Sequence, residues 1–465
     1  MDTSLTVPRK SKDVATVATL VFIAVLMFVL ATWAPGDELR LPVLVTASVV
    51  VLGLTFLVPN WSITIAYPLT WIIWSLNIEA VGGGPERLIV VLGLLGMPIM
   101  LGKFGKMSLG VTRLVGWGLA TFVSMFVMSF YANPVSPEGV ETIVSVASRV
   151  LFLFLVMFHI RTEQDLKVAS IVYIAAAFVP AILAGWLGLQ FGFGFIRVSE
   201  TYIAARSTVD PLLLSTSFSA GFATAPALFL LAFYPWVRKP WSKRLLIVGV
   251  LFLLAMAFVS QLRREIMIAI PVLLGILALD KASGVKKIAS QFFLVVVVAF
   301  PLLILPNFTI LQMRFHDENP QIAGGTDPRL MNFAAGLSAF AESPVFGTGP
   351  GSYTKTVIPF LGYNQPTFLY SPYNVFIWAA VETGFLSVVG LLLILYGVLR
   401  EGMKWRSGAD GLSGLVLRIS PALIAQIIIW FTFGAGWVLS LPWFLMGIIL
   451  AAARITKEKT VRLVR

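Results

Sequence analysis

The sequence predicts an all-α polytopic membrane protein with about 14 transmembrane helices. Of its 465 residues, 58% are hydrophobic and only 12% are Asp, Glu, Lys or Arg, whereas about 25% are charged in a typical soluble domain. Several nearly uncharged runs, among them residues 14–33, 41–58 and 245–259, approach the ~20 residues that cross the bilayer core. Together these observations exclude a soluble globular fold.

The order of the apolar runs predicts three regions. Residues 1–305 hold helices 1–11, and residues 306–371 form a long, partly helical periplasmic loop between helices 11 and 12. Residues 372–465 hold helices 12–14 and a basic cytoplasmic tail. The third run is interrupted by Pro59 and Pro68, so a re-entrant segment is an alternative there. We expect the spans to begin near Val14, Leu41, Trp61, Leu88, Val111, Val140, Leu166, Pro211, Leu245, Ile266, Ala289, Pro372, Leu412 and Ala435.

The distribution of basic residues predicts the orientation of the chain in its membrane. With the amino terminus inside, most Lys and Arg residues fall in cytoplasmic loops, as the positive-inside rule requires. The net charge of +12 is therefore explained by topology and by contact with anionic lipid rather than by nucleic-acid binding. The long loop faces the periplasm in this arrangement. The absence of Cys excludes disulfides, thiolate catalysis and Cys-ligated metals.

Nine basic residues fall in loops expected outside, and eight of them are Arg. Since the orientation rule disfavours them there, they need another explanation. A guanidinium is permanently charged and matches phosphate oxygens two at a time, which indicates a diphosphate or another polyanion at the outer surface. Pairing with nearby acids or lipid headgroups is the alternative. The nine are Arg40, Arg87, Arg197, Arg206, Arg263, Arg264, Arg314, Arg329 and Lys355.

Three outer segments carry the candidate chemistry. The segment 260–265 places two adjacent Arg at a helix start, where the helix dipole favours anions. A bound anion would relieve this conflict, and Glu265 would relieve part of it. The Gly-rich stretch 347–351 lacks the following Lys-Ser/Thr of a phosphate-binding loop, and is interpreted as a turn that lets backbone approach closely. The polar residues of the segments 191–210, 260–265 and 306–374 include Arg197, Glu200, Arg206, Asp210, Arg263, Arg264, Glu265, Arg314, His316, Arg329, Tyr373 and Asn374.

Two charges fall inside expected spans. Arg149 lies about halfway through the sixth, and Glu382 lies within the twelfth. Intramembrane charges are usually paired or functional. For Arg149, pairing with an acid or carbonyl in the bundle and binding a lipid phosphate in a lateral cleft both remain open.

The spacing of these residues resembles the O-antigen ligase and polymerase superfamily. The resemblance is carried by Asp327-Pro-Arg329, by the run Ser343-Pro-Val-Phe-Gly-Thr-Gly-Pro-Gly-Ser-Tyr353, and by Tyr373-Asn374 followed by Gly384. Arg263 and Arg264 approximate the family's Ser-Arg pair, and the similarity covers about residues 260–391. It implies a membrane glycosyltransferase of the GT-C type, inverting and metal-independent, with no cofactor.

The resemblance also implies a place in the bacterial inner membrane, with the active site facing the periplasm, and it implies partners and residue roles. The donor would be a glycan on undecaprenyl diphosphate and the acceptor a glycan or lipid, with membrane lipids around the protein and polysaccharide export machinery as a candidate partner. Arg264 and Arg329, with Tyr373, Glu200 and Glu265, are the candidate catalytic residues. Arg197, Arg206, Arg263, Arg314, His316 and Asn374 are the candidates for binding diphosphate or glycan.

The chain departs from the family at one position. The ligase branch has a His that activates the acceptor hydroxyl, and Tyr373 stands there. A Tyr with a pKa of about 10 is a poor base at neutral pH. This shifts the prediction from lipid A ligase toward polymerases and leaves Glu200, Glu265, Asp210 and His316 as candidate bases. Protein O-glycosylation stays open, and a lipid-linked polysaccharide flippase or exporter is the alternative from another class.

Overall fold

The computed structural model describes residues 53–55, 57–69, 84–104, 112–134, 136–191, 222–259, 270, 328–361, 374–406, 411–433 and 440–464. These ranges contain helices and turns and no β-strand. Six of the described helices are long and apolar enough to cross a membrane, which agrees with a multi-pass membrane protein. In chain order the elements are η1 (Ser62–Ala66), α4 (Gly84–Phe104), α5 (Arg113–Ala132), α6 (Pro137–His159), α7 (Glu163–Phe191), α11 (Thr224–Phe233), η3 (Tyr234–Trp236), α12 (Pro240–Val259), α16 (Pro328–Glu342), α17 (Tyr353–Leu361), α18 (Val375–Thr383), α19 (Phe385–Lys404), α20 (Gly411–Phe433) and α21 (Leu441–Val464).

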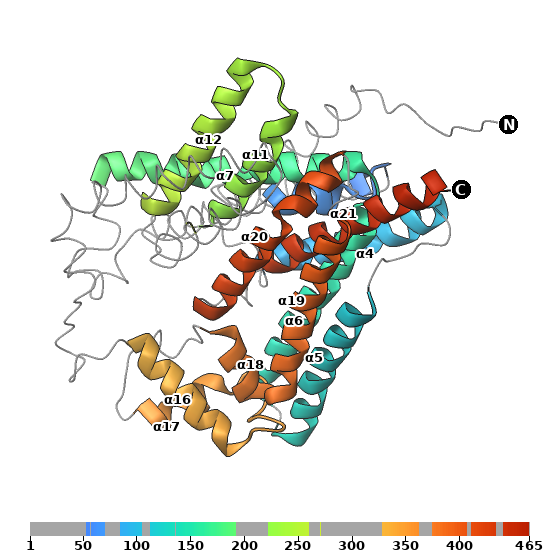
Figure 1. The fold of residues 1–465 in the computed structure, drawn as a ribbon. Coiled ribbons are helices and arrows are strands. Elements are labelled where there is room, and N and C mark those ends of the chain that lie inside the picture. Colours follow the sequence, from blue (N-terminus) through green and yellow to red (C-terminus); the bar gives the residue numbers. More distant parts are fainter. Residues whose placement is uncertain are drawn as a thin grey trace, which may run out of the picture.

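Helices α5, α6 and α19 run together, with α16, α17 and α18 gathered at one of their ends (Figure 1). Helices α7, α11 and α12 pack on one another at the other end. We call the end that carries α16–α18 the turn end and the opposite one the tail end. The tail end is where α21 runs out into its basic carboxyl-terminal residues.

Local sequence signals set several helix boundaries. The hydroxyl of Ser136 accepts the backbone N–H of Gly139 (3.0 Å) and Pro137 takes the first helical position, which together begin α6. At the start of α7, Thr162 and Asp165 bond reciprocally through side chains and backbone N–H groups at 3.0 and 3.1 Å. This is a capping box.

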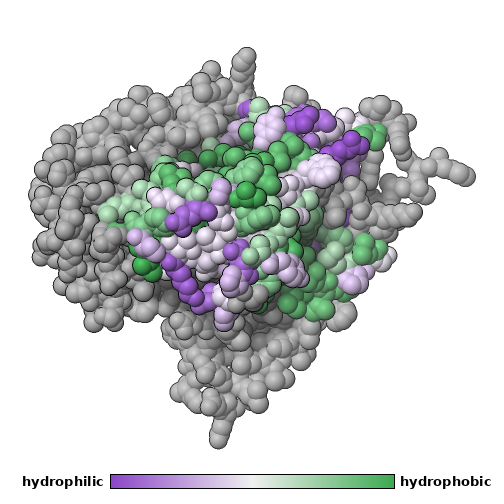
Figure 2. Space-filling model, turned by 90° about the horizontal axis from the view of Figure 1, so that it is seen from below, coloured by the Kyte–Doolittle hydropathy of each residue, from purple (hydrophilic) through white to green (hydrophobic). Residues whose placement is uncertain are grey.

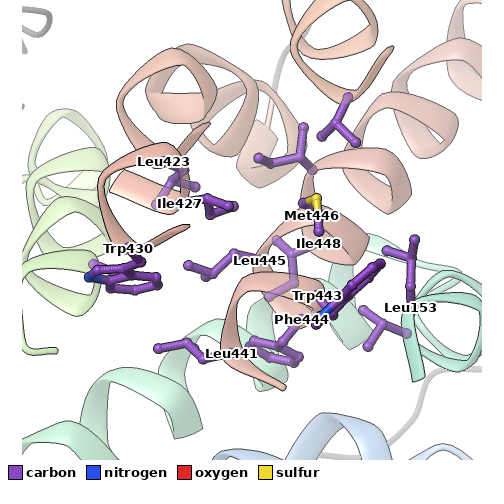
Figure 3. Packing of buried hydrophobic residues seen from close by; sticks show 14 of the residues in the cluster. Leu153, Leu423, Ile427, Trp430, Leu441, Trp443, Phe444, Leu445, Met446 and Ile448 are labelled. Carbon is purple, nitrogen blue, oxygen red and sulfur yellow. The ribbon is translucent and has the colours of Figure 1, made fainter. Parts of the chain in front are cut away.

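The core is built around α20 and α21. Every residue from 441 to 456 is buried, as expected of a helix that is apolar on all sides. Figure 3 shows Phe444 and Leu445 of α21 among side chains of α20, such as Trp430, with Leu153 of α6 nearby. At the tail end, buried Arg454 donates to the carbonyls of Met157 (2.6 Å) and Ile160 (2.5 Å). It thereby satisfies carbonyls left unpaired at the end of α6.

The prediction of one continuous twelfth span from near Pro372 is wrong. The chain forms the short α18, breaks at Gly384 with φ +86°, and starts the candidate span α19 at Phe385. Glu382 therefore lies at the end of α18, before the span, and not within the span. Apolar residues flank Glu382-Thr383-Gly384 on both sides, and three residues are too short an interruption for hydropathy to reveal the break.

Candidate functional site

The turn between α16 and α17, residues 343–352, is the Gly turn, and it docks on the junction of α18 and α19. The backbone N–H of Thr348 donates to the carbonyl of Val381 (2.8 Å), and that of Gly349 to the carbonyl of Glu382 (3.0 Å). In return Phe385 N–H donates to the carbonyl of Pro344 (3.0 Å). These bonds join two segments about 35 residues apart in sequence into one rigid unit.

Glycine is required where this docking occurs. Gly347, Gly351 and Gly384 have positive φ of 68°, 75° and 86°, a region that side chains with a Cβ rarely adopt. A Cβ on Gly347 or on Gly384 would meet backbone atoms of Glu382 or Val345, respectively, and one on Gly351 would lie 2.5 Å from the carbonyl carbon of Glu138. The prediction of a close backbone approach is confirmed. The backbone of the Gly turn approaches the backbone of α18 at Glu382 and that of α6 at Glu138.

The last turn of α5 and its C-cap residue Asn133 hydrogen-bond to α18 and to the Gly turn. Ser129 Oγ donates to the carbonyl of Glu382 (2.7 Å), and Asn133 Nδ2 to the carbonyl of Ser129 (2.9 Å). Asn133 also approaches the carbonyl of Gly347 at 3.5 Å. The Gly turn is thus held between the end of α5, the start of α6 and the end of α18.

A buried polar network connects the Gly turn to α16. The hydroxyl of Tyr353 donates to Oδ1 of Asn332 (2.8 Å), while Tyr353 N–H donates to the carboxylate of Glu382 (3.2 Å). Asn332, Tyr353 and Glu382 are 2%, 4% and 2% exposed. Burial raises the pKa of Glu382 to about 7, with hydrogen bonds from the backbone of Gly351 and Tyr353 acting in the opposite direction. Burial also raises the pKa of the Tyr353 phenol, and the nearby Glu382 raises it further.

Arg149 of α6 lies close to the start of α18, because both line the same small cavity. It lines a cavity of about 10 Å³, room for roughly one water molecule. The guanidinium bonds Ser148 Oγ at 3.4 Å, and the indole N–H of Trp443, also on the cavity, has no hydrogen-bond partner among the described residues. Arg149 and Trp443 both bring hydrogen-bond donors to this cavity, and none of the described residues that line it is acidic. The lining residues are Phe122, Val146, Arg149, Val375, Trp378, Leu391, Phe431 and Trp443.

Two of the predicted site residues lie in the described part of the chain. Asn374 precedes α18, and its Oδ1 accepts the N–H groups of Phe376 (2.9 Å) and Ile377 (3.0 Å), so it caps that helix. Arg329 is the second residue of α16, as predicted for an Arg at a helix start, and its side chain lies outside the described part. The other candidates also lie outside it: Arg197, Glu200, Arg206, Asp210, Arg263, Arg264, Glu265, Arg314, His316 and Tyr373.

The structure brings the helices of Arg329 and Asn374 together. Gly336 of α16 lies directly against Ile377 of α18, and both helices contact Tyr353 or the turn before it. The network residues Ser129 and Asn332 were not singled out from sequence, and Tyr353 entered only as the last residue of the Gly-rich run, with no role assigned. Their contacts span up to 253 positions in the chain, and no local pattern marks them. Arg149 carried a signal, namely a charge in an apolar run.

Comparison with known families adds an independent finding. Residues 249–395 match a family model described as O-antigen ligase. A search of curated proteins found no match. The matched segment contains Arg263, Arg264, Arg329, the Gly turn and Asn374, which are the positions that carried the resemblance. The resemblance to the O-antigen ligase and polymerase superfamily is therefore confirmed, through a match over residues 249–395.

Proposed function

We propose that this protein is an inverting, metal-independent glycosyltransferase that moves a glycan from undecaprenyl diphosphate to a glycan acceptor, as a polymerase or ligase. In this proposal it lies in the bacterial inner membrane and acts at the periplasmic face. The family match supports an enzyme that acts on lipid-linked glycans. The single structural observation that carries the proposal is the Gly turn, which fastens α16, the helix of Arg329, to α18, the helix that Asn374 caps.

The chemistry that such a site must perform is departure of a diphosphate from an anomeric carbon. The negative charge that develops on the leaving group needs preorganised positive partners in a water-poor site. Arg329 lies in the first turn of α16, and Arg149 lies in the middle of α6, close to the start of α18. With Arg263 and Arg264 they are the proposed diphosphate partners. A lipid-linked donor would reach this site from within the bilayer.

Acceptor activation falls to a residue other than the family His. Tyr373 can position a hydroxyl or stack on a sugar ring, and proton removal is assigned to one of Glu200, Glu265, Asp210 and His316. General base catalysis requires reach to the acceptor hydroxyl. Asparagine or glutamine substitution at each acid, and His316→Gln, would identify the base by the loss of product at saturating donor.

The test is a reconstituted transfer reaction. Purified protein in lipid is supplied with lipid-linked glycan, and the products are resolved by chromatography and mass spectrometry. Free undecaprenyl diphosphate with an elongated or acceptor-linked glycan is expected, with no loss of product in a chelator. Movement of the donor between leaflets without bond cleavage would instead identify an exporter.

Arginine variants sharpen the assignment. Arg149→Ala, Arg264→Ala and Arg329→Ala should each abolish product while the protein still inserts in the membrane. Lys at these positions should rescue only partly, because the two-pronged geometry of guanidinium is lost. The control is Arg400→Ala, an exposed Arg near the tail end of α19, which should leave product unchanged. Wild-type product from the first three alanine variants would refute the site.

A further inference from the structure

The Gly turn has an exposed apolar edge, formed by Val345 and Phe346. These side chains are 48% and 41% exposed, although the turn backbone is fixed by hydrogen bonds on both sides. Single exposed apolar residues are normal, whereas a contiguous exposed apolar patch marks a contact with protein or membrane. The identity of the cover follows from what lies next to this edge.

The apolar edge adjoins the start of a membrane-spanning helix. The carbonyl of Pro344 accepts the N–H of Phe385, the first residue of α19, and Phe385 is itself 46% exposed. On the other flank, Asn133 contacts Gly347, and Tyr131, two residues before it at the end of α5, is 83% exposed. Large amphipathic and aromatic side chains at the ends of spans are typical of the membrane interface.

The exposed surface continues along α19 as a single face. Phe385, Val389, Leu392 and Tyr396 are 46%, 40%, 51% and 58% exposed. Their spacing of four, three and four residues places them on one side of the helix. Because α19 is a candidate span, we expect this face to meet lipid. The edge of the Gly turn extends the face beyond the helix start.

The residues after the Gly turn, near the start of α6, include an exposed ion pair. Lys355, shortly after the turn, pairs with Glu138 at 3.3 Å, and their side chains are 69% and 55% exposed. Such an exposed ion pair belongs in water or among headgroups. Figure 2, which views the molecule from the turn end, shows hydrophilic and hydrophobic residues side by side over the described surface. The turn therefore has an apolar edge beside the span and a polar side beside the start of α6.

We propose that Val345 and Phe346 enter the bilayer and contact lipid acyl chains near the headgroup boundary. The Gly turn is then a membrane anchor as well as a clamp, and it holds α16 and α18 at the level of the bilayer surface. This inference does not depend on the transfer reaction.

The absence of Cys in the chain makes the test direct. Phe346→Cys and Val345→Cys each provide a single site for a nitroxide spin label. Leu392→Cys, roughly 10 Å further along α19, is the lipid reference, and Lys355→Cys is the water reference. All four positions are exposed, so substitution there should leave the fold intact, which size-exclusion profiles of the reconstituted variants check.

The measurement is the collision rate of each label with oxygen, which concentrates in lipid, and with a water-soluble nickel chelate. For labels at Val345 and Phe346 we expect an oxygen-to-nickel ratio several-fold above that at Lys355 and approaching that at Leu392. A ratio equal to that at Lys355 would place the edge in water and overturn the proposal. Low collision rates with both reagents would show that protein covers it, which also overturns the proposal.

Discussion

Replacement of Gly384 by Ala tests how the Gly turn is held to the start of α19. The φ of +86° and ψ of 172° at Gly384 lie in a region essentially restricted to Gly, where another residue costs about 1–3 kcal/mol. A Cβ would also meet the carbonyl oxygen of Val345 and disturb the 3.0 Å bond from Phe385 N–H to Pro344. A hydrogen bond contributes about 0.5–1.5 kcal/mol. Together these effects predict that Gly384→Ala destabilises the docked turn by roughly 2–4 kcal/mol.

Amide hydrogen exchange of the protein in lipid nanodiscs measures this local stability. The amides of Thr348, Gly349 and Phe385 are protected only while the turn is docked, so their exchange should become roughly 30- to 700-fold faster in Gly384→Ala. The control is Gly102→Ala in α4, where nothing lies within 4 Å of an added Cβ and Ala is the better helix former. Equal exchange in wild type and both variants would refute the reasoning.

Three further predictions concern the same unit. Burial raises the pKa of Glu382 from 4.5 to about 7, so the folded protein binds this proton more tightly than the unfolded chain does. The stabilisation from protonated Glu382 is therefore complete below pH 4.5 and declines by up to roughly 3 kcal/mol as the pH rises to 7. Thermal unfolding across this range should show the decline in wild type, and the same slope in Glu382→Gln would contradict it. Asn374→Ala should lower the free energy of unfolding by about 0.5–2 kcal/mol, because the cap of α18 is lost, whereas Asn374→Asp keeps the cap. Transfer activity of the Asp variant then separates the two roles: a residue that only caps α18 predicts wild-type activity, and a residue that contacts substrate predicts a loss. Tyr353→Phe removes a bond to buried Asn332 and should lower the unfolding free energy by about 1–3 kcal/mol; an unchanged denaturation midpoint would argue against this buried bond.

Hydropathy predicted the starts of four of the six described candidate spans closely, because their causes are local. Expected starts at Val111, Val140, Leu166 and Leu412 fall within three residues of the observed α5, α6, α7 and α20. Each begins where a charged or polar stretch or a capping side chain meets an apolar run, and both signals are present in the sequence itself. The bilayer requires backbone bonds to be satisfied within each segment, so length and polarity decide the outcome.

The break at Gly384 escaped prediction because its cause is distant. A Gly in an apolar helical pattern is tolerated in most helices, and only the Gly turn, about 35 residues earlier, makes a positive φ favourable there. The same holds for Glu382, whose partners come from the turn and from α5. For the Gly turn itself, composition predicted a close backbone approach, but its target could not be read from spacing.

The position of the site depends finally on how α5 and α19 pack. An added Cβ on Gly118 would lie 2.9 Å from the carbonyl oxygen of Gly390, and one on Gly397 would lie 3.1 Å from the backbone N of Val115, so the two helix backbones touch directly. Small residues permit this approach in membranes, where packing rather than the hydrophobic effect drives helix association. The close packing brings the end of α5, with Asn133, to the start of α19, and the Gly turn fits between them. Gly390→Leu, deep in this contact, should therefore force the helices apart and release the turn, seen as faster amide exchange at Thr348, whereas a protected turn in that variant would show that its docking is independent of the bundle.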